Sequence, residues 1–231
     1  MTDTPPPVLT IDGPSGSGKG TIARRLAREL GWHYLDSGAV YRALGLAVER
    51  RGLDPDDAQA VVETARGLAL RFRPADRPED DCVDLDGVDV SAALRGEACA
   101  ALASRVAALG PVRAALLERQ RGFRMAPGLV ADGRDMGTTV FPDATLKVFL
   151  TASAEARAGR RYKQLKEKGI EVTIASLARE IAERDRRDAG RSASPLKAAD
   201  DAVVIDSTDL SIDSVTATVR AKLHERLTSA A

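Results

Sequence analysis

Hydrophobic positions along the chain follow two spacings, which predict strands that alternate with helices. Residues 8–11 are a short β-branched run, typical of a buried strand, and the run stops at residues 12–14, which favour a tight turn. Beyond the following glycines, apolar residues recur at helical spacing at Ile22, Leu26 and Leu30. The N-terminal part of the sequence therefore predicts strand, loop and helix.

The same alternation continues downstream. A brief strand at residues 34–35 precedes a helix whose apolar face carries Val40, Leu44 and Val48. Asp54 and Pro55 resemble an N-cap and a first helical residue, which predicts a helix through Leu70. A helical pattern resumes from about residue 91 to 124, with an interruption near Gly110-Pro111. Further strands are predicted at 129–131, 146–150 and 202–205, with helices between them and a final helix from about 211 to 227.

Residues 71–90 differ from the rest of the chain in their pattern of apolar residues. Their short apolar segments are separated by Pro74, Pro78 and Asp86-Gly87, which predicts a small antiparallel β insertion. Elsewhere, strands that alternate with helices indicate an α/β fold, with a central parallel sheet of five strands and helices on both faces.

Composition narrows the classes of protein. The chain has 231 residues, enough for one main core. It contains no run of about 20 apolar residues, so we expect no membrane span. The first seven residues lack the features of a signal peptide, which predicts a cytoplasmic protein. Thirty-four basic residues balance thirty-four acidic ones, so net charge does not indicate a nucleic-acid or membrane partner.

Metal-binding patterns are weak. Cys82 and Cys99 do not form a CxxC pair, and the two histidines, His33 and His224, do not complete a zinc constellation. We interpret both cysteines as reduced thiols of a cytosolic protein.

Acidic residues follow several predicted strands. Ligands of open parallel sheets bind beyond the carboxyl ends of the strands, so Asp12, Asp36 and Asp132 are expected to face a common crevice. Aspartate also favours turns and helix caps, and for Asp206, which precedes Ser-Thr, the turn is the preferred interpretation.

A glycine-rich loop lies between the first strand and the first helix. Such a loop turns consecutive backbone N–H groups toward phosphate oxygens, and an exposed lysine adds positive charge at the β and γ phosphates. Glycine-rich loops occur at many strand–helix junctions, but here the lysine and its spacing also match a P-loop. The predicted ATP-binding residues are Gly13, Pro14, Ser15, Gly16, Ser17, Gly18, Lys19, Gly20 and Thr21.

The residue after the lysine departs from the usual P-loop, where Ser or Thr holds magnesium. Gly20 occupies that position and Thr21 follows it, which resembles the GKGT loop of nucleoside monophosphate kinases and leaves the direct magnesium ligand open. The departure, and the lack of an NKxD-type segment in the sequence, count against a regulatory GTPase.

A second candidate site begins at residue 36. Ser37 is expected at a helix start, with Tyr41 and Arg42 one turn on, and the helix dipole, a hydroxyl and a guanidinium suit a dianionic phosphate. The alternative makes Ser37 an ordinary N-cap and Arg42 a solvated charge. On these residues alone, that alternative is favoured.

Two further charged clusters follow. The strand at 129–131 runs into a turn that contains Asp132, Arg134 and Asp135, and Asp132 stands where a Walker B acid would meet magnesium. Residues 184–191 are rich in arginine and follow a helix that carries Arg157, Arg160 and Arg161. Phosphoryl transfer needs positive charge, often from a mobile lid, although a solvated helix of mixed charge is the alternative.

Four segments together closely resemble bacterial cytidylate kinases, in the same order and at matching spacings: IDGPSGSGKGT, YLDSGAVYR, VADGRDMGTTVFPDA and ERDRRDAGR. The resemblance covers about residues 8 to 227. It implies a single P-loop kinase domain over residues 1–231, acting as a cytoplasmic monomer. Within this domain, residues 71–90 would lie in an NMP-binding region of about 37–110, and about 157–191 would form an arginine-rich lid.

The resemblance also implies roles for individual residues. ATP would be the donor, with Mg²⁺ near Thr21 and Asp132, and CMP or dCMP the acceptor, giving CDP or dCDP in pyrimidine metabolism. Lys19, Asp132, Arg134 and Arg184 would be catalytic. The acceptor phosphate would bind to Arg42, Arg134 and Arg184. The base would bind to Ser104, Arg113 and Asp135. The sugar would bind to Asp188 and Arg191. Asp36, Ser37 and Tyr41 would also face the acceptor, and Arg157, Arg160 and Arg161 the ATP side.

Two other functions stay open at the level of sequence. One is a kinase for a different small acceptor, such as UMP or a metabolite that is not a nucleotide. The other is a nucleotide-binding switch without catalysis, for which the acceptor motifs and the arginine lid would be superfluous. In the kinase interpretation no side-chain nucleophile is needed, because the acceptor phosphate attacks and the protein supplies positioning and charge.

Overall fold

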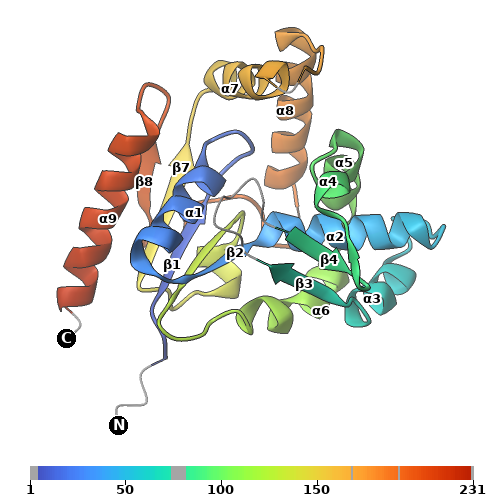
Figure 1. The fold of residues 1–231 in the computed structure, drawn as a ribbon, viewed down its shortest axis with the longest axis horizontal. Coiled ribbons are helices and arrows are strands. Elements are labelled where there is room, and N and C mark those ends of the chain that lie inside the picture. The colour runs from blue at the N-terminus through green and yellow to red at the C-terminus, as the bar shows by residue number, and fades with distance from the viewer. Residues whose placement is uncertain (1–4, 74–81, 168, 192, 230–231) are drawn as a thin grey trace. The chain divides into compact units, whose positions relative to one another are not determined.

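The computed structural model describes residues 5–73, 82–167, 169–191 and 193–229 (Figure 1). The chain divides into two compact units. One, here called the sheet unit, comprises residues 1–35 and 123–231. The other, the helical unit, comprises residues 36–122. Each is described by itself.

The sheet unit is built on five strands in the order β2-β6-β1-β7-β8. Their bounds are β1 Val8–Asp12, β2 His33–Asp36, β6 Leu129–Gly133, β7 Leu146–Thr151 and β8 Val203–Asp206. Strand β1 pairs in parallel with β6 and β7, and β7 pairs in parallel with β8. The predicted five-stranded parallel sheet is therefore confirmed. Asp12, at the end of β1, lies beside Gly133 of β6, so the segments after both strands begin at the same edge.

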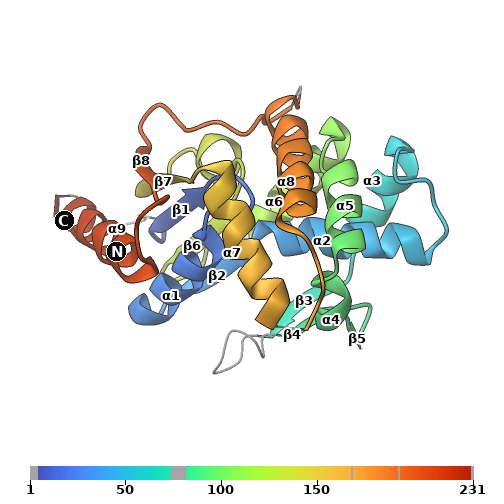
Figure 2. The same cartoon turned by 90° about the horizontal axis from the view of Figure 1, so that it is seen from above.

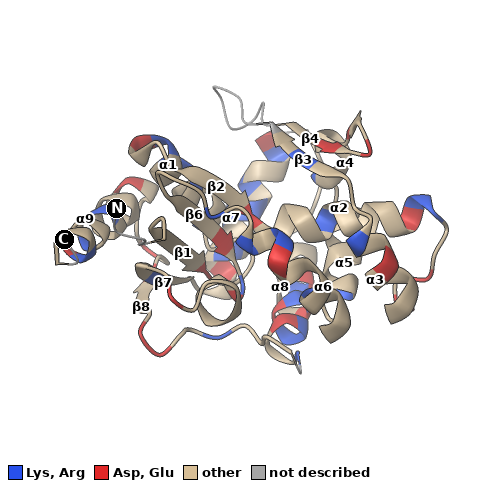
Figure 3. Cartoon of the chain, turned by 90° about the horizontal axis from the view of Figure 1, so that it is seen from below, with Lys and Arg blue, Asp and Glu red and all other residues tan. Residues whose placement is uncertain are grey.

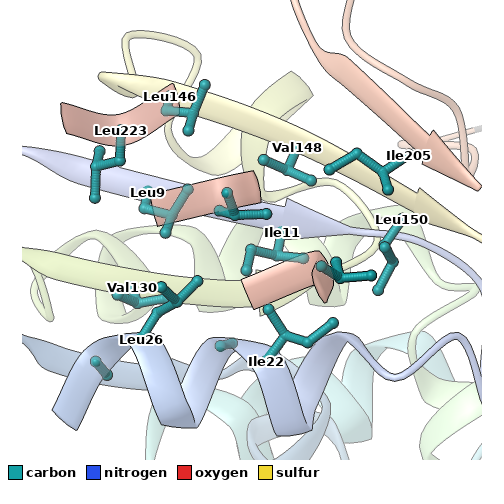
Figure 4. Close-up of a cluster of buried hydrophobic side chains, with 14 residues drawn as sticks. Leu9, Ile11, Ile22, Leu26, Val130, Leu146, Val148, Leu150, Ile205 and Leu223 are labelled. Atoms are coloured by element: carbon teal, nitrogen blue, oxygen red, sulfur yellow. The ribbon is translucent and has the colours of Figure 1, made fainter. Parts of the chain in front are cut away.

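Two helices cover one face of this sheet. Apolar side chains of α1 (Lys19–Leu30) and α9 (Ile212–Ser229) pack with those of the strands in one buried cluster, part of which Figure 4 shows. Leu26 of α1 is completely buried in it, and its replacement by alanine would cost about 2–5 kcal/mol of stability. The 3.6-residue spacing of apolar positions in α1 is what brings these side chains to one face.

On the opposite face lies η2 (Met136–Val140), a short π-helix that follows β6. Its Gly137 lies against Thr10 of β1 and Lys147 of β7. Sequence analysis predicts only a turn here. The extra residue per turn of a π-helix leaves no periodic signal in so short a segment.

Helices α7 (Ala154–Glu167) and α8 (Ile174–Ala189) follow β7 and lie side by side (Figure 2). Acidic and basic residues alternate along α8, as Figure 3 shows. An ion pair joins the two helices, because Arg157 donates to Asp185 at 2.7 Å.

The helical unit is arranged around α2 (Ser37–Arg50), most of which is buried. Gly45 permits a close approach to α5, because a Cβ there would lie 3.0 Å from that of Leu102. The remaining helices are α3 Ala58–Arg66, α4 Ser91–Leu94, α5 Glu97–Val106 and α6 Gly110–Arg121. Strands β3 (Leu70–Arg73), β4 (Cys82–Leu85) and β5 (Val88–Asp89) form the predicted small antiparallel sheet. Residues 74–81 of that insertion lie outside the described residues.

The prediction of a helix from Asp54 through Leu70 is wrong at both ends. Asp57 is the N-cap of α3, and its carboxylate accepts hydrogen bonds from two backbone amides of the first turn. Asp54 instead accepts from the amide of Asp56 in the preceding turn, and Leu70 already belongs to β3. Both aspartates suit a cap, and the sequence does not show which one the turn leaves free to cap the helix.

Residues 91–124 contain three helices, and Gly110-Pro111 begins α6 rather than interrupting a helix, which fits the preference of proline for the first helical turn. In the described part of the chain, no single helix is long and apolar enough to cross a membrane. One pair of helices, Ala98–Val106 and Gly110–Arg121, has the length and composition of a membrane span when the two are taken together. The pair is bent by 100°.

Candidate active site

The glycine-rich loop leaves the N-terminus of α1 available to an anion. Gly16 and Gly18 have φ angles of +78° and +93°, which glycine adopts without strain. At Gly13 a Cβ would lie 2.0 Å from the carbonyl oxygen of Leu150, so no larger residue fits. Among the described residues, no side chain caps α1, and no acid lies in its first turn. The backbone amides at this helix start and the positive end of the helix dipole therefore suit a phosphate.

Lys19 is placed differently from the expected exposed loop lysine. It is the first residue of α1 and is only 8% exposed, and its Nζ donates to the carbonyl oxygen of Pro14 at 3.1 Å. The ammonium group thus lies across the loop. Ser17 is also buried, and its Oγ has no hydrogen-bond partner among the described residues. A buried hydroxyl without a partner is costly unless a ligand satisfies it.

Two of the three arginines predicted on the ATP side contact the loop. Arg157 donates to the carbonyl oxygen of Ser15 at 3.2 Å, and Arg160 donates to that of Ser17 at 3.3 Å. Arg160 also contacts Ser207, whose Oγ donates to the same Ser17 oxygen at 3.1 Å. Carbonyl oxygens orient both guanidinium groups, and the charge of Arg157 is also paired with Asp185. Arg161, on the same helix, is half-buried, and its role stays a prediction.

Asp132 lies beside the start of α1. The hydroxyl of Tyr34 donates to its Oδ1 at 2.8 Å, and its Oδ2 lies 3.4 Å from where a Cβ of Gly20 would stand. The carboxylate of Asp132 therefore lies against the phosphate loop at the position where the P-loop is unusual. Arg24 stacks over the Tyr34 ring at 5.4 Å, which fixes the ring in turn. Thr21 is exposed.

These residues fit a magnesium ion of the kind that binds with a nucleotide. The described residues contain no group of three or more His, Cys, Asp or Glu side chains that could hold a metal. Mg²⁺ typically uses one or two carboxylates, and phosphate oxygens and water complete its shell. One carboxylate, Asp132, placed beside the phosphate loop suits that pattern.

Asp12, the last residue of β1, is buried below the phosphate loop. Its two carboxylate oxygens accept the backbone N–H groups of Met136 at 2.9 Å and Gly137 at 2.8 Å. Burial removes the carboxylate from water and raises the pKa of Asp12 to about 7, although these two hydrogen bonds oppose the rise. The nearby Asp135 raises the pKa further and Arg134 lowers it.

Asp188 joins two of the predicted acceptor arginines. Arg134 donates to its Oδ2 at 2.8 Å, and Arg191 pairs with its Oδ1. Burial opposes ionisation of Asp188, but the charges of Arg134, Arg191 and Arg184 hold its pKa below the usual value. The structure therefore brings Arg134 together with Arg184, Asp188 and Arg191, a cluster that lies far from Arg134 in sequence. Asp135, next to Arg134, is 3% exposed.

The helical unit carries the other predicted acceptor residues. Asp36, rather than Ser37, is the N-cap of α2: it accepts the amide of Ala39 at 2.9 Å and pairs with Arg42 at 2.9 Å. Arg42 also lies over Gly38, since a Cβ there would stand 3.3 Å from its Nη1. Ser37 is the first helical residue and is buried. Arg42 is thus held at the start of the helix and is not an unpartnered surface charge.

Tyr41, Ser104 and Arg113 are buried within the helical unit. The guanidinium of Arg113 lies over the ring of Tyr41 at 5.3 Å and donates to the carbonyl oxygen of Ala107 at 3.2 Å. Ser104, on α5, is 3% exposed, and its Oγ has no hydrogen-bond partner among the described residues. These groups have the polarity of a recognition site rather than of an ordinary core.

Sequence reasoning missed three supporting residues: Tyr34, Asp185 and Ser207. Tyr34 was interpreted only as part of a strand, yet its hydroxyl orients Asp132. Asp185 was grouped with the lid arginines but holds Arg157. Ser207 follows the turn aspartate Asp206 and contacts the phosphate loop. No local pattern could have found these roles, because each depends on a partner more than 25 residues away.

Comparison with known proteins shows the family of the chain. The family model described as Cytidylate kinase matches residues 9–225. The chain belongs to this family. It is 57% identical over 209 residues to a cytidylate kinase of Nitrosococcus oceani, covering 90% of this chain and 92% of the relative. With a cytidylate kinase of Methylococcus capsulatus it shares 59% identity over 215 residues, covering 93% and 95%.

Family membership makes the chain an ATP-dependent nucleoside monophosphate kinase, as the sequence predicts. A gluconokinase of Sinorhizobium meliloti is among the similar solved structures, with 16% identity, a TM-score of 0.46, and coverage of 95% of this chain and 93% of that one. That likeness is too distant for a comparison of sites.

Proposed function

We propose that the enzyme transfers the γ-phosphoryl group of ATP to CMP or dCMP, giving ADP and CDP or dCDP. The observation that carries this proposal is a second set of buried polar groups besides the phosphate loop. Asp135, Arg113 and Ser104 are each less than 9% exposed, and the Ser104 hydroxyl has no partner among the described residues. A buried hydroxyl without a partner is costly, so a polar ligand that pairs with Ser104 is expected.

Catalysis consists of positioning and charge stabilisation. An oxygen of the acceptor phosphate attacks the γ-phosphorus of ATP, and the bond from that phosphorus to the β–γ bridging oxygen breaks. The α1 amides and Lys19 hold the donor phosphates, and Arg134 and Arg184 stabilise the charge on the transferring group. Mg²⁺ bound near Asp132 would neutralise phosphate charge. Side chains supply no nucleophile and form no covalent intermediate.

Recognition of the acceptor uses three groups of residues in this proposal. Arg42, Arg134 and Arg184 bind the acceptor phosphate, while Asp188 and Arg191 bind the sugar. The carboxylate of Asp135 accepts a hydrogen bond from the 4-amino group of cytosine, and Arg113 and Ser104 donate to its ring acceptors. Asp36, Ser37 and Tyr41, in the first turns of α2, also face the acceptor.

The remaining assignments are also proposals. Helices α7 and α8, within about residues 157–191, act as a lid whose arginines reach the phosphates when it closes. We propose a cytoplasmic monomer without a nucleic-acid or membrane partner, and the balanced charge of the sequence supports the absence of a nucleic-acid partner.

Base selectivity tests the proposal. Uracil presents a carbonyl where cytosine has its amino group, so it would leave Asp135 facing an acceptor. An unpaired buried group costs about 1–3 kcal/mol, and CMP should exceed UMP by roughly tenfold or more in kcat/KM. A coupled assay of ADP release across the common nucleoside monophosphates measures this ratio.

Asp135→Asn sharpens the same test. An amide can present either a donor or an acceptor. The variant should therefore narrow the ratio of kcat/KM for CMP to kcat/KM for UMP, chiefly by lowering the value for CMP. Glu49→Gln is the matched control, because it removes one negative charge from an exposed position on α2 that has no proposed role. Equal use of both nucleotides by the wild type, or an unchanged ratio in Asp135→Asn, would show that Asp135 does not read the base.

A further inference from the structure

Both carboxylate oxygens of Asp12 accept hydrogen bonds from the backbone of η2. One oxygen accepts the amide of Met136 and the other the amide of Gly137, at 2.9 and 2.8 Å. Asp12 itself is 3% exposed. Both hydrogen bonds span more than 120 residues of sequence and join the strand that precedes the phosphate loop to the segment that follows β6.

The first amides of η2 need a partner of this kind. The amides of Thr139 and Val140 donate back to the carbonyl oxygen of Asp135, and that of Phe141 donates to Met136. Amides at the very start of a helix lack intrahelical acceptors. Asp12 satisfies two of them from outside the helix, as an N-cap would do from within the chain.

Tight packing prevents η2 from shifting freely. At Gly137 a Cβ would lie 2.9 Å from Oγ1 of Thr10 and 3.2 Å from the side chain of Lys147. The π-helix is therefore held against β1 both by steric contact and by the Asp12 hydrogen bonds. Arg134 and Asp135 immediately precede it, so their backbone position depends on this attachment.

We infer that Asp12 is a positioning residue for the acceptor: by holding the first amides of η2, it fixes Arg134 and Asp135 relative to the phosphate loop, which starts at the next residue. This inference rests on the proposed roles of Arg134 and Asp135 in acceptor binding. The backbone of Asp12 is held separately, because it pairs with Gly133 and Phe149 in the sheet. A side-chain change should therefore disturb η2 more than the ATP loop.

Asp12→Asn keeps the size of the side chain but faces one η2 amide with a donor instead of an acceptor. We expect KM for CMP to rise roughly tenfold, since one buried amide loses its partner, while KM for ATP changes less than about threefold. The ratio of kcat/KM for CMP to kcat/KM for UMP should narrow as well, because Asp135 is displaced from the position in which it reads the base. A merely structural role would lower the amount of active enzyme and leave both KM values alone.

Asp57→Asn is the matched control, because the Asp57 carboxylate also accepts two backbone amides at a helix start, at 3.0 and 3.2 Å. It should leave both KM values unchanged. Equal changes of KM for CMP and ATP in Asp12→Asn, or no change in either, would overturn the inference. A wild type that does not phosphorylate CMP would overturn the proposed function instead.

Gly137→Ala provides a second, independent variant if Asp12→Asn does not fold. Its methyl group would push η2 away from Thr10 while Asp12 stays intact. A selective rise in KM for CMP supports the inference, and an unchanged KM for CMP in the folded variant overturns it.

Discussion

Strands β1 and β2 both lead into helices, yet their junctions use aspartate in opposite ways. Asp12 ends β1 and turns its carboxylate toward η2, which leaves the N-terminus of α1 uncapped by any described side chain. Asp36 ends β2 and caps α2 directly. The first junction can bind phosphate with backbone amides alone. At the second, a carboxylate already occupies an amide, so an anion needs the charge of Arg42.

Different consequences follow for the two junctions. At the β1 junction, the backbone would supply the proposed anion site, and Lys19, whose Nζ donates to Pro14, would add charge across it. At the β2 junction, the ion pair of Asp36 with Arg42 holds a guanidinium at the helix start. Donor binding should therefore depend on glycines and one lysine, whereas acceptor binding should depend on individual side chains.

The largest expected effect is at Lys19. Lys19→Met keeps the buried aliphatic stem but removes the charge, so phosphoryl transfer should fall by a hundredfold or more, equivalent to about 3–4 kcal/mol in the barrier. Steady-state kinetics give the loss, and circular dichroism verifies the fold. Lys222→Met, on α9, is the matched control and should be active. A folded Lys19→Met variant with wild-type turnover would contradict the assignment of the phosphate loop.

Arg42 tests the second junction. In Arg42→Ala, Asp36 remains as the cap of α2 but the cation is lost. A hydrogen bond to a charged group contributes about 1.5–3 kcal/mol, so KM for CMP should rise at least roughly tenfold, with little change in KM for ATP. The control is Arg105→Ala, which removes an exposed arginine of the same unit that pairs with Asp56. Equal effects of Arg42→Ala on both substrates would remove the distinction between the junctions.

The sequence predicts these junctions unequally, for a physical reason. A phosphate loop is made by contiguous residues, because consecutive amides must point at one anion, and so residues 13–21 are recognisable from spacing alone. Strands β1, β6 and β7 are equally clear, since buried parallel strands are short apolar runs, whereas β2 and β8 are only partly buried. Arg157 and Arg160 contact the carbonyl oxygens of Ser15 and Ser17, and their place on the ATP side stays a prediction.

What the sequence does not predict depends on distant neighbours. Tyr34 orients Asp132 across 98 residues, and the π-helical turn at Met136–Val140 forms where Asp12 can satisfy its amides. The burial of Lys19 arises because Nζ bends back to Pro14, although a polar loop favours an exposed lysine. The choice between Asp54 and Asp57 as cap was likewise decided by the turn between them.

The smallest expected effect is a pH dependence of stability at the β1 junction. Burial raises the pKa of Asp12 to about 7, whereas an unfolded aspartate titrates near 3.8. Between these values the folded protein binds a proton that the unfolded chain has released. The contribution of Asp12 to stability is therefore fully present below the unfolded pKa and is lost as pH rises through 7.

Denaturant unfolding of the wild type and Asp12→Asn at pH 5 and pH 7 measures this contribution. Between those pH values, the free energy of unfolding of the wild type should fall relative to Asp12→Asn by about 2 kcal/mol, because one proton is worth at most ~1.4 kcal/mol per pH unit. Asp36→Asn removes the same charge at the β2 junction, where asparagine caps a helix as well as aspartate does. It should unfold in parallel with the wild type as pH changes. If the free energy of unfolding of Asp12→Asn also changes with pH in parallel with that of the wild type, the Asp12 carboxylate is not desolvated in the folded protein. The two junctions would then not differ in this property.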